Sequence, residues 1–301
     1  MNHGNILKRA WSVLWQTRAL WLFGFLFALA GGSSGLPGLR GTNGAGNGGT
    51  PARPGTRFPF HMPTLSTNTI VLIVAGVVIA VLVIVAVAAV VRYLAETALV
   101  AGVDEMETTG ARLTVRRGFR LGWSRRAWRL FVTDFVIYVP LAIGGLLLLA
   151  IAALPFLVWL SRETAVRIAG SVIGGLLVLA VILALIALAL LLTLVMPYVR
   201  RRVVLAGQGV RAAVRQGVSL VRTTLADTGL MWLILAGLRI VWSVVMIPVF
   251  IVVALAAAIV GGGLFLLVFI AGYSLAAGLF EAYVSAAWTL TYREVSAKLG
   301  A

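Results

Sequence analysis

Long apolar stretches dominate this chain, and shorter segments that carry most of its charge alternate with them. A helix needs about 20 predominantly apolar residues to cross about 30 Å of hydrocarbon. The stretches that pass this test cover 69–91, 131–160, 168–199, 229–260 and 264–290. Prolines inside them are compatible with spanning helices and predict bends; they are Pro140, Pro155, Pro197 and Pro248. The pattern therefore predicts five membrane-spanning helices.

A shorter apolar stretch, residues 19–33, fits two descriptions. A short apolar segment that follows basic residues is typical of a cleaved signal peptide. The preceding segment, however, has apolar residues at helical spacing along one face, which a signal peptide does not need. These residues are Leu7, Trp11, Leu14 and Trp15. We therefore expect residues 19–33 to be retained as the first of six spans.

The basic residues set the expected orientation of the spans. Most of the 25 lysines and arginines fall in segments on the same side as the N-terminus. Arg239 lies within a span, and those predicted for the opposite side are Arg40, Arg53, Arg57, Arg162 and Arg167. Because positive charge is retained on the cytoplasmic side of short loops, both termini are predicted to be cytoplasmic.

The segments before the spans form a weak repeat of about 100 residues. Each unit is expected to place an amphipathic helix at the membrane surface before two spans, and the units cover 1–92, 93–202 and 203–301. Residues 31–67, rich in Gly, Pro, Ser and Thr, predict a flexible external loop. The expected fold is one all-α membrane domain: a polytopic bundle of six transmembrane helices in three hairpins, each preceded by a cytoplasmic amphipathic helix.

The amino-acid composition limits the class of protein and the kinds of functional site that the chain can contain. With 61% hydrophobic and 11% charged residues, the chain is neither an ordinary soluble protein nor a disordered one. It has no cysteine, which excludes zinc-thiolate sites and thiol nucleophiles. Its two histidines, His3 and His61, lie outside the predicted spans, so the membrane region has no serine–histidine dyad or H-E-x-x-H site. We expect no enzymatic activity, no metal and no cofactor.

Arginines at helical spacing give candidate lipid-binding residues. They are Arg112, Arg116, Arg120, Arg211, Arg215 and Arg222. Each cation near an anionic membrane surface contributes about 1 kcal/mol, so the net charge of +16 is better explained by anionic lipid than by nucleic acid. The expected partners are anionic lipids, with a protein partner or a second copy of the chain left open. The alternative is that these arginines only fix topology and anchor the bundle.

Three ionisable residues fall within the predicted spans, where charge is costly and often functional. Asp134 lies near the interface, where pairing with a neighbouring arginine is expected. Arg239 follows Gly229 by ten residues and Glu281 precedes Leu290 by nine, so antiparallel spans place both about 15 Å from the cytoplasmic edge. We hypothesise an Arg239–Glu281 ion pair, which either offsets two buried charges or lines a substrate or proton path.

Several short motifs add a family resemblance. They are Arg9-Ala10-Trp11, Arg117-Gly118-Phe119, Gly24-Phe25-Leu26, Val103-Asp104-Glu105 and Ala287-Trp288-Thr289-Leu290-Thr291-Tyr292-Arg293. Together they resemble uncharacterised bacterial six-span membrane proteins, which are similar to the membrane domain attached to some glycerophosphoryl diester phosphodiesterases. The resemblance implies a multi-pass protein of the bacterial cytoplasmic membrane. It carries over no catalytic residue, because nothing in the chain resembles the soluble phosphodiesterase domain.

Two classes of function follow from these patterns. The first is a non-enzymatic membrane scaffold that binds lipids or partners through its cytoplasmic arginine-rich helices. The second is a small transporter or channel that uses Arg239 and Glu281 near the middle of the bilayer. The first requires exposed cationic faces and no water-filled cavity, whereas the second requires a polar path and broken helices. The first is favoured because a transporter is expected to have more polar groups within its spans.

Overall fold

The computed structural model describes residues 2–31, 67–111, 113–160, 163–260 and 263–298, and these are helical almost throughout, with no strand among them. The helices in chain order are α1 (His3–Gln16), α2 (Ala19–Leu29), α3 (Thr67–Thr109), α4 (Val115–Gly122), α5 (Arg125–Ala153), the 3₁₀ helix η1 (Leu154–Leu160), α6 (Thr164–Leu205), α7 (Val210–Thr223), α8 (Leu225–Val260) and α9 (Gly263–Lys298). The predicted loop 31–67 lies almost wholly outside the described residues, as does Arg112.

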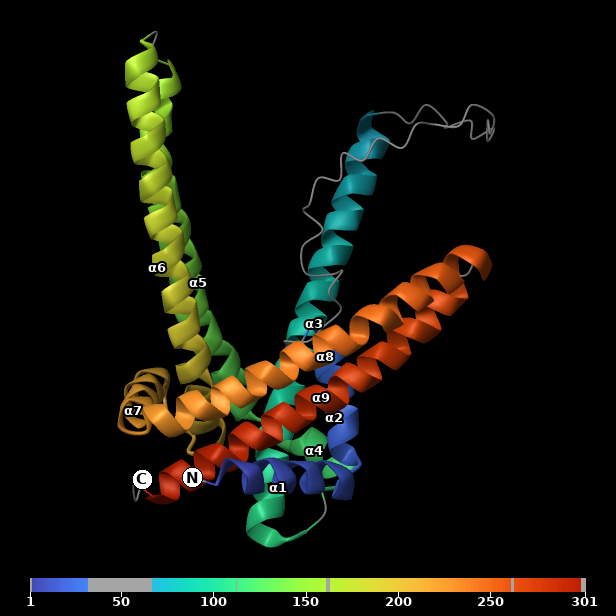
Figure 1. Cartoon of the computed structure of the whole chain (residues 1–301). Helices are drawn as coiled ribbons and strands as arrows, with labels where there is room; N and C mark the ends of the chain where they lie inside the picture. Colours follow the sequence, from blue (N-terminus) through green and yellow to red (C-terminus); the bar gives the residue numbers. More distant parts are fainter. Residues whose placement is uncertain (1, 32–66, 112, 161–162, 261–262, 299–301) are drawn as a thin grey trace.

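Five of these helices are long and apolar enough to cross a membrane, namely α3, α5 with η1, α6, α8 and α9. They form three arms that diverge from a common base: α5 with α6, α8 with α9, and α3 alone (Figure 1). Apolar side chains cover the arms, and residues 71–87 of α3 are all exposed. Such surfaces are compatible with lipid and not with water, as in a multi-pass membrane protein.

The five longer predicted spans lie inside the observed helices, 131–160 across α5 and η1, but several helices run further. α3 continues past residue 91 to Thr109, and α6 continues past residue 199 to Leu205. The boundaries expected between the repeat units, at 92/93 and 202/203, therefore fall within continuous helices. Three of the prolines lie inside α5, α6 and α8, and Pro155 lies in η1 at the far end of its arm.

The short helix α2 differs most from what the pattern predicted. It has 11 residues, which extend about 16 Å at the rise of an α-helix, and it meets α1 at a bend of 99°. α2 by itself therefore covers about half of the roughly 30 Å of hydrocarbon that a span crosses. A sixth span and a hairpin between α2 and α3 remain predictions.

Instead of extending an arm, α2 crosses α9 in the base. The crossing is close because two glycines face each other, and a Cβ on either Gly24 or Gly278 would meet the backbone of the other helix. Small residues allow such approach between helices in membranes. α2 thereby fixes where the α8–α9 arm leaves the base.

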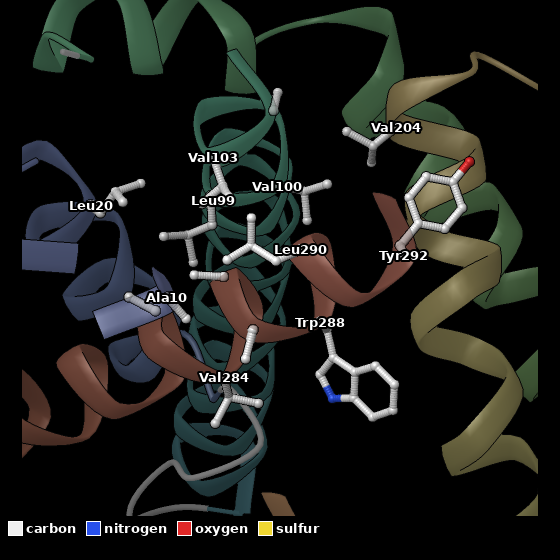
Figure 2. Packing of buried hydrophobic residues seen from close by; sticks show 14 of the residues in the cluster. Ala10, Leu20, Leu99, Val100, Val103, Val204, Val284, Trp288, Leu290 and Tyr292 are labelled. Atoms are coloured by element: carbon white, nitrogen blue, oxygen red, sulfur yellow. The ribbon is translucent and has the colours of Figure 1, made fainter. Parts of the chain in front are cut away.

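The hydrophobic core lies in the base, where α1, α2, α4 and α7 surround the near ends of the long helices (Figure 1). α1 lies along α9, with the rings of Trp11 and Tyr283 6.0 Å apart. Gly217 of α7 packs on Val199 of α6. Figure 2 shows side chains of α1, α2, α3, α6 and α9 in this core, and those labelled are Ala10, Leu20, Leu99, Val100, Val103, Val204, Val284, Trp288, Leu290 and Tyr292.

Candidate functional site

A cavity of about 490 Å³ lies where the three arms leave the base. Its walls come from α3, α6, α8 and α9, with single residues from α2 and α5. Charged side chains are concentrated in the lining; they are Arg92, Glu96, Arg200, Arg201, Arg239 and Glu281. The described chain thus has a cavity with six charged side chains in its lining, next to arms whose surfaces are apolar.

Arg200 of α6 is bound by carboxylates from two other helices. Its Nη1 donates to Glu96 Oε1 of α3 at 2.8 Å, and its Nη2 donates to Asp134 Oδ2 of α5 at 2.7 Å. The Nε also donates to Asp134, at 3.3 Å, and Tyr93 donates its hydroxyl to the same carboxylate. Asp134 is 3% exposed and Glu96 8%. This buried network holds α3 and the α5–α6 arm together.

Arg201, the next residue, is buried, and no carboxylate of the described residues forms an ion pair with it. Its Nη1 and Nη2 donate to the carbonyls of Pro197 and Ser285, at 2.8 and 3.0 Å, and its Nε has no partner. Arg92 of α3 also lines the cavity, with its guanidinium 5.9 Å from the centre of the Phe27 ring and its Nε also buried and without a partner. The lining therefore contains buried N–H donors that have no acceptor among the described residues.

Arg239 and Glu281 meet across α8 and α9. Arg239 Nη2 lies 3.3 Å from Glu281 Oε2, the arrangement that the antiparallel register predicts. Glu281 is 4% exposed, whereas the side chain of Arg239 is 37% exposed. The pair forms one wall of the cavity, on the side of the α8–α9 arm.

A family model described as a family of unknown function (DUF7544) matches residues 7–296. The chain belongs to the DUF7544 family. No curated protein and no solved structure matches the chain. The family match shows no link to the glycerophosphoryl diester phosphodiesterases, so that part of the expected resemblance is not supported.

The other predicted site residues of this DUF7544 protein lie on the outside of the base. Arg116 and Arg120 of α4 are exposed, and so are Arg211, Arg215 and Arg222 of α7. The opposite face of α7 is buried against the base, through Ala213, Gly217, Leu220 and Val221. These arginines are separate from the cavity, which brings together only Arg239 and Glu281 of the predicted set, with Asp134 behind Arg200.

Arg117, beside these residues on α4, has a partner. It forms an ion pair with Glu105 near the end of α3, and this hydrogen bond raises the pKa of the Arg117 guanidinium. Arg9 of α1 pairs similarly with Glu107. Carboxylates at the end of α3 thus hold α1 and α4 in place at the base.

Sequence reasoning missed the roles of Arg92, Glu96, Arg200 and Arg201. The arginines were counted only as topological charge, and Glu96 lies beyond the predicted end of its span. A signal was available, because the chain has nine acidic residues against 25 basic ones. In such a chain each carboxylate within an apolar stretch is a candidate partner for an arginine. Among the described residues, no group of three or more histidine, aspartate or glutamate side chains is arranged to hold a metal.

Proposed function

We propose that this DUF7544 protein is a non-enzymatic protein of the bacterial cytoplasmic membrane that binds anionic lipids with the arginine-bearing helices of its base. In this proposal it crosses the membrane six times, with both termini and the base on the cytoplasmic side. The supporting observation is the position of the exposed arginines of α4 and α7 next to arms whose surfaces are apolar. Arms in hydrocarbon place these arginines at the level of lipid phosphates.

Exposed tryptophans support the same placement. Trp11, Trp15, Trp123 and Trp128 are each more than half exposed, and all belong to the base or to the start of the α5–α6 arm. Tryptophan is enriched where membranes meet water, because its ring is apolar and its N–H is polar. The part of the base formed by α1 and α4 then lies in the headgroup region, where it contacts lipids.

The test measures lipid enrichment around the full-length protein. The protein is reconstituted in phosphatidylcholine bilayers in which only the leaflet that faces the base also contains phosphatidylglycerol; it is then excised in polymer nanodiscs, and the retained lipids are quantified. We expect phosphatidylglycerol to be enriched over the bulk, with the enrichment falling as salt screens the charges. Replacing Arg211, Arg215 and Arg222 together by Gln should remove most of the α7 contribution, about 3 kcal/mol at about 1 kcal/mol per cation.

The matched control replaces three arginines that the charge pattern predicts on the other side of the membrane, Arg40, Arg53 and Arg57. It removes the same charge and should leave the lipid ratio near that of the parent when only the cytoplasmic leaflet contains phosphatidylglycerol. Equal enrichment in the parent and the α7 variant would contradict the proposal. A larger effect from the control than from the α7 variant would contradict the proposed orientation.

A second candidate, a small transporter or channel, is favoured by one observation. The cavity is lined by Arg239 and Glu281, the pair expected on a transport path. Flux of protons and small anions into proteoliposomes tests this function directly. Flux that requires Glu281 would support transport, and its absence while lipid enrichment persists would support the lipid-binding function.

A further inference from the structure

Charge in the cavity is unbalanced. Four arginines and two glutamates line it, and Asp134, which lies behind Arg200, adds one further carboxylate. Each of these carboxylates already has an arginine partner, since Glu96 and Asp134 bind Arg200 and Glu281 binds Arg239. No ion pair of the described residues involves Arg92 or Arg201. The lining thus carries an excess positive charge, on the two arginines that lack a carboxylate.

A buried arginine with unused donors is energetically costly unless an anion offsets it. Arg201 is 5% exposed, its Nε has no partner, and its other two nitrogens bind only carbonyls. Arg92 likewise keeps its Nε unsatisfied. Both side chains line the same cavity. A tetrahedral oxyanion suits this arrangement, because phosphate offers several oxygens and binds guanidinium groups through paired hydrogen bonds.

The rest of the lining is apolar and aromatic. Trp232 and Trp288 stand in the walls with Phe27, Leu99 and Met196. Above the cavity the arms diverge, and their exposed side chains form apolar surfaces on which hydrocarbon chains can lie (Figure 1). Polar groups that fix a ligand's head within apolar walls are typical of ligand sites of this volume. The arrangement fits a molecule with an anionic head and an apolar tail.

We propose that the cavity binds one phosphate group per chain, carried by a lipid whose hydrocarbon chains lie between the arms. Arg92 and Arg201 bind the phosphate oxygens. Arg239 also binds them when its ion pair with Glu281 weakens. This inference rests on the proposed placement in the membrane and names a lipid site inside the base. It is distinct from the surface arginines of α7, which lie outside the cavity.

The test uses full-length protein, freed of co-purified lipid in a mild detergent, and three probes. Phosphatidic acid supplies phosphate and chains, diacylglycerol with the same chains supplies chains alone, and inorganic phosphate supplies the anion alone. Native mass spectrometry counts bound molecules, and tryptophan fluorescence, to which Trp232 and Trp288 contribute, gives the affinity. We expect one bound phosphatidic acid per chain and at least tenfold weaker binding of the other two probes.

Variants assign the binding to the cavity. Arg92→Gln and Arg201→Gln should each weaken phosphatidic acid binding about tenfold, the effect of losing one partly buried charge contact. Glu281→Gln should strengthen it several-fold, because it removes a negative charge that repels the phosphate. A gain of affinity does not arise from misfolding, so this variant keeps the test decisive if an arginine variant folds poorly. Arg126→Gln, an exposed arginine at the start of α5, is the matched control and should leave affinity unchanged.

The outcomes separate the sources of the anion. Inorganic phosphate that binds as tightly as phosphatidic acid, with the same dependence on Arg92 and Arg201, would retain the phosphate site and overturn its assignment to a lipid. Diacylglycerol that binds equally well would overturn the proposal, since charge would play no part. Loss of phosphatidylglycerol enrichment in the α7 variant, with phosphatidic acid binding intact, would show that surface and cavity act separately. Intact enrichment with no saturable binding would overturn the cavity site alone.

Discussion

The base and the arms are both rich in apolar residues, yet they bury them to opposite extents. In the base, Leu20 and Leu99 are each 1% exposed, and Val204 is fully buried. In the arms, Leu146 is 72% exposed and Leu82 63%. Hydrophobicity alone therefore does not place a residue in the protein core here. Burial in this chain is decided by which segments gather at the near ends of the long helices.

The difference has a physical reason. Lipid chains are as apolar as leucine, so the hydrophobic effect gives helices in a membrane little cause to associate. Close backbone approach, packing and buried polar contacts supply the specificity instead. The base has all three: the Gly24–Gly278 crossing, the core of Figure 2 and the Arg200 network. We conclude that contacts in the base fix how the helices are arranged, while lipid covers the surfaces of the arms.

The strongest test of this comparison removes the charge at the centre of the base. Arg200→Gln leaves Glu96 and Asp134 buried without their guanidinium, and losing one partner of a buried pair costs 3–5 kcal/mol. We expect the free energy of unfolding to fall by about 4 kcal/mol, measured by titrating detergent-solubilised protein with SDS and following circular dichroism. Adding Asp134→Asn should recover part of the loss, because it removes one stranded charge. A loss no larger than that of Arg126→Gln would contradict a structural role for the network.

A pair of leucine truncations compares the two regions directly. Leu20→Ala in α2 opens a cavity in the packed core and should cost about 3 kcal/mol. Leu146→Ala in α5 should cost below about 0.5 kcal/mol in the same titration, because lipid or detergent fills the space that it leaves. Equal losses would mean that the arms pack against protein, either in a closed bundle or in an oligomer.

Features that depend only on residues close together in the chain could be predicted from the sequence. Apolar length was enough to locate the five long helices, and the fixed rise of a helix was enough to place Arg239 opposite Glu281. Composition predicts a span over residues 19–33, whereas the close packing of α2 depends on Gly278, far away in the chain. The contact of Arg200 with Glu96 and Asp134 joins three helices whose relative placement no local pattern encodes. The hydrophobic pattern is therefore enough to predict the helices. The cavity cannot be predicted without knowing how the helices converge at the base.

The crossing of α2 over α9 gives an intermediate effect. Gly278→Ala places a methyl group against the backbone of α2, and overpacking of this kind costs about 2 kcal/mol. Gly272→Ala, on the same helix, meets nothing within 4 Å, so it should be neutral or slightly stabilising. The two variants are compared by thermal unfolding in the same detergent. Equal melting temperatures would show that the close crossing does not hold the base together.

The smallest effect is expected where the base passes into the α8–α9 arm, at Arg239 and Glu281. Arg239→Glu and Glu281→Arg each place like charges together, and the double exchange restores an attractive pair. Because the side chain of Arg239 is 37% exposed and that of Arg200 only 17%, we expect a weaker coupling here than in the Arg200 network, about 1 kcal/mol. A cycle of SDS unfolding on the parent, both single variants and the exchange measures this coupling. If the losses of the two single variants simply add, the pair behaves like the arms, where contacts between helices contribute little to stability. If the coupling is as large as that of Arg200, the tightly packed base includes this part of α8 and α9 as well.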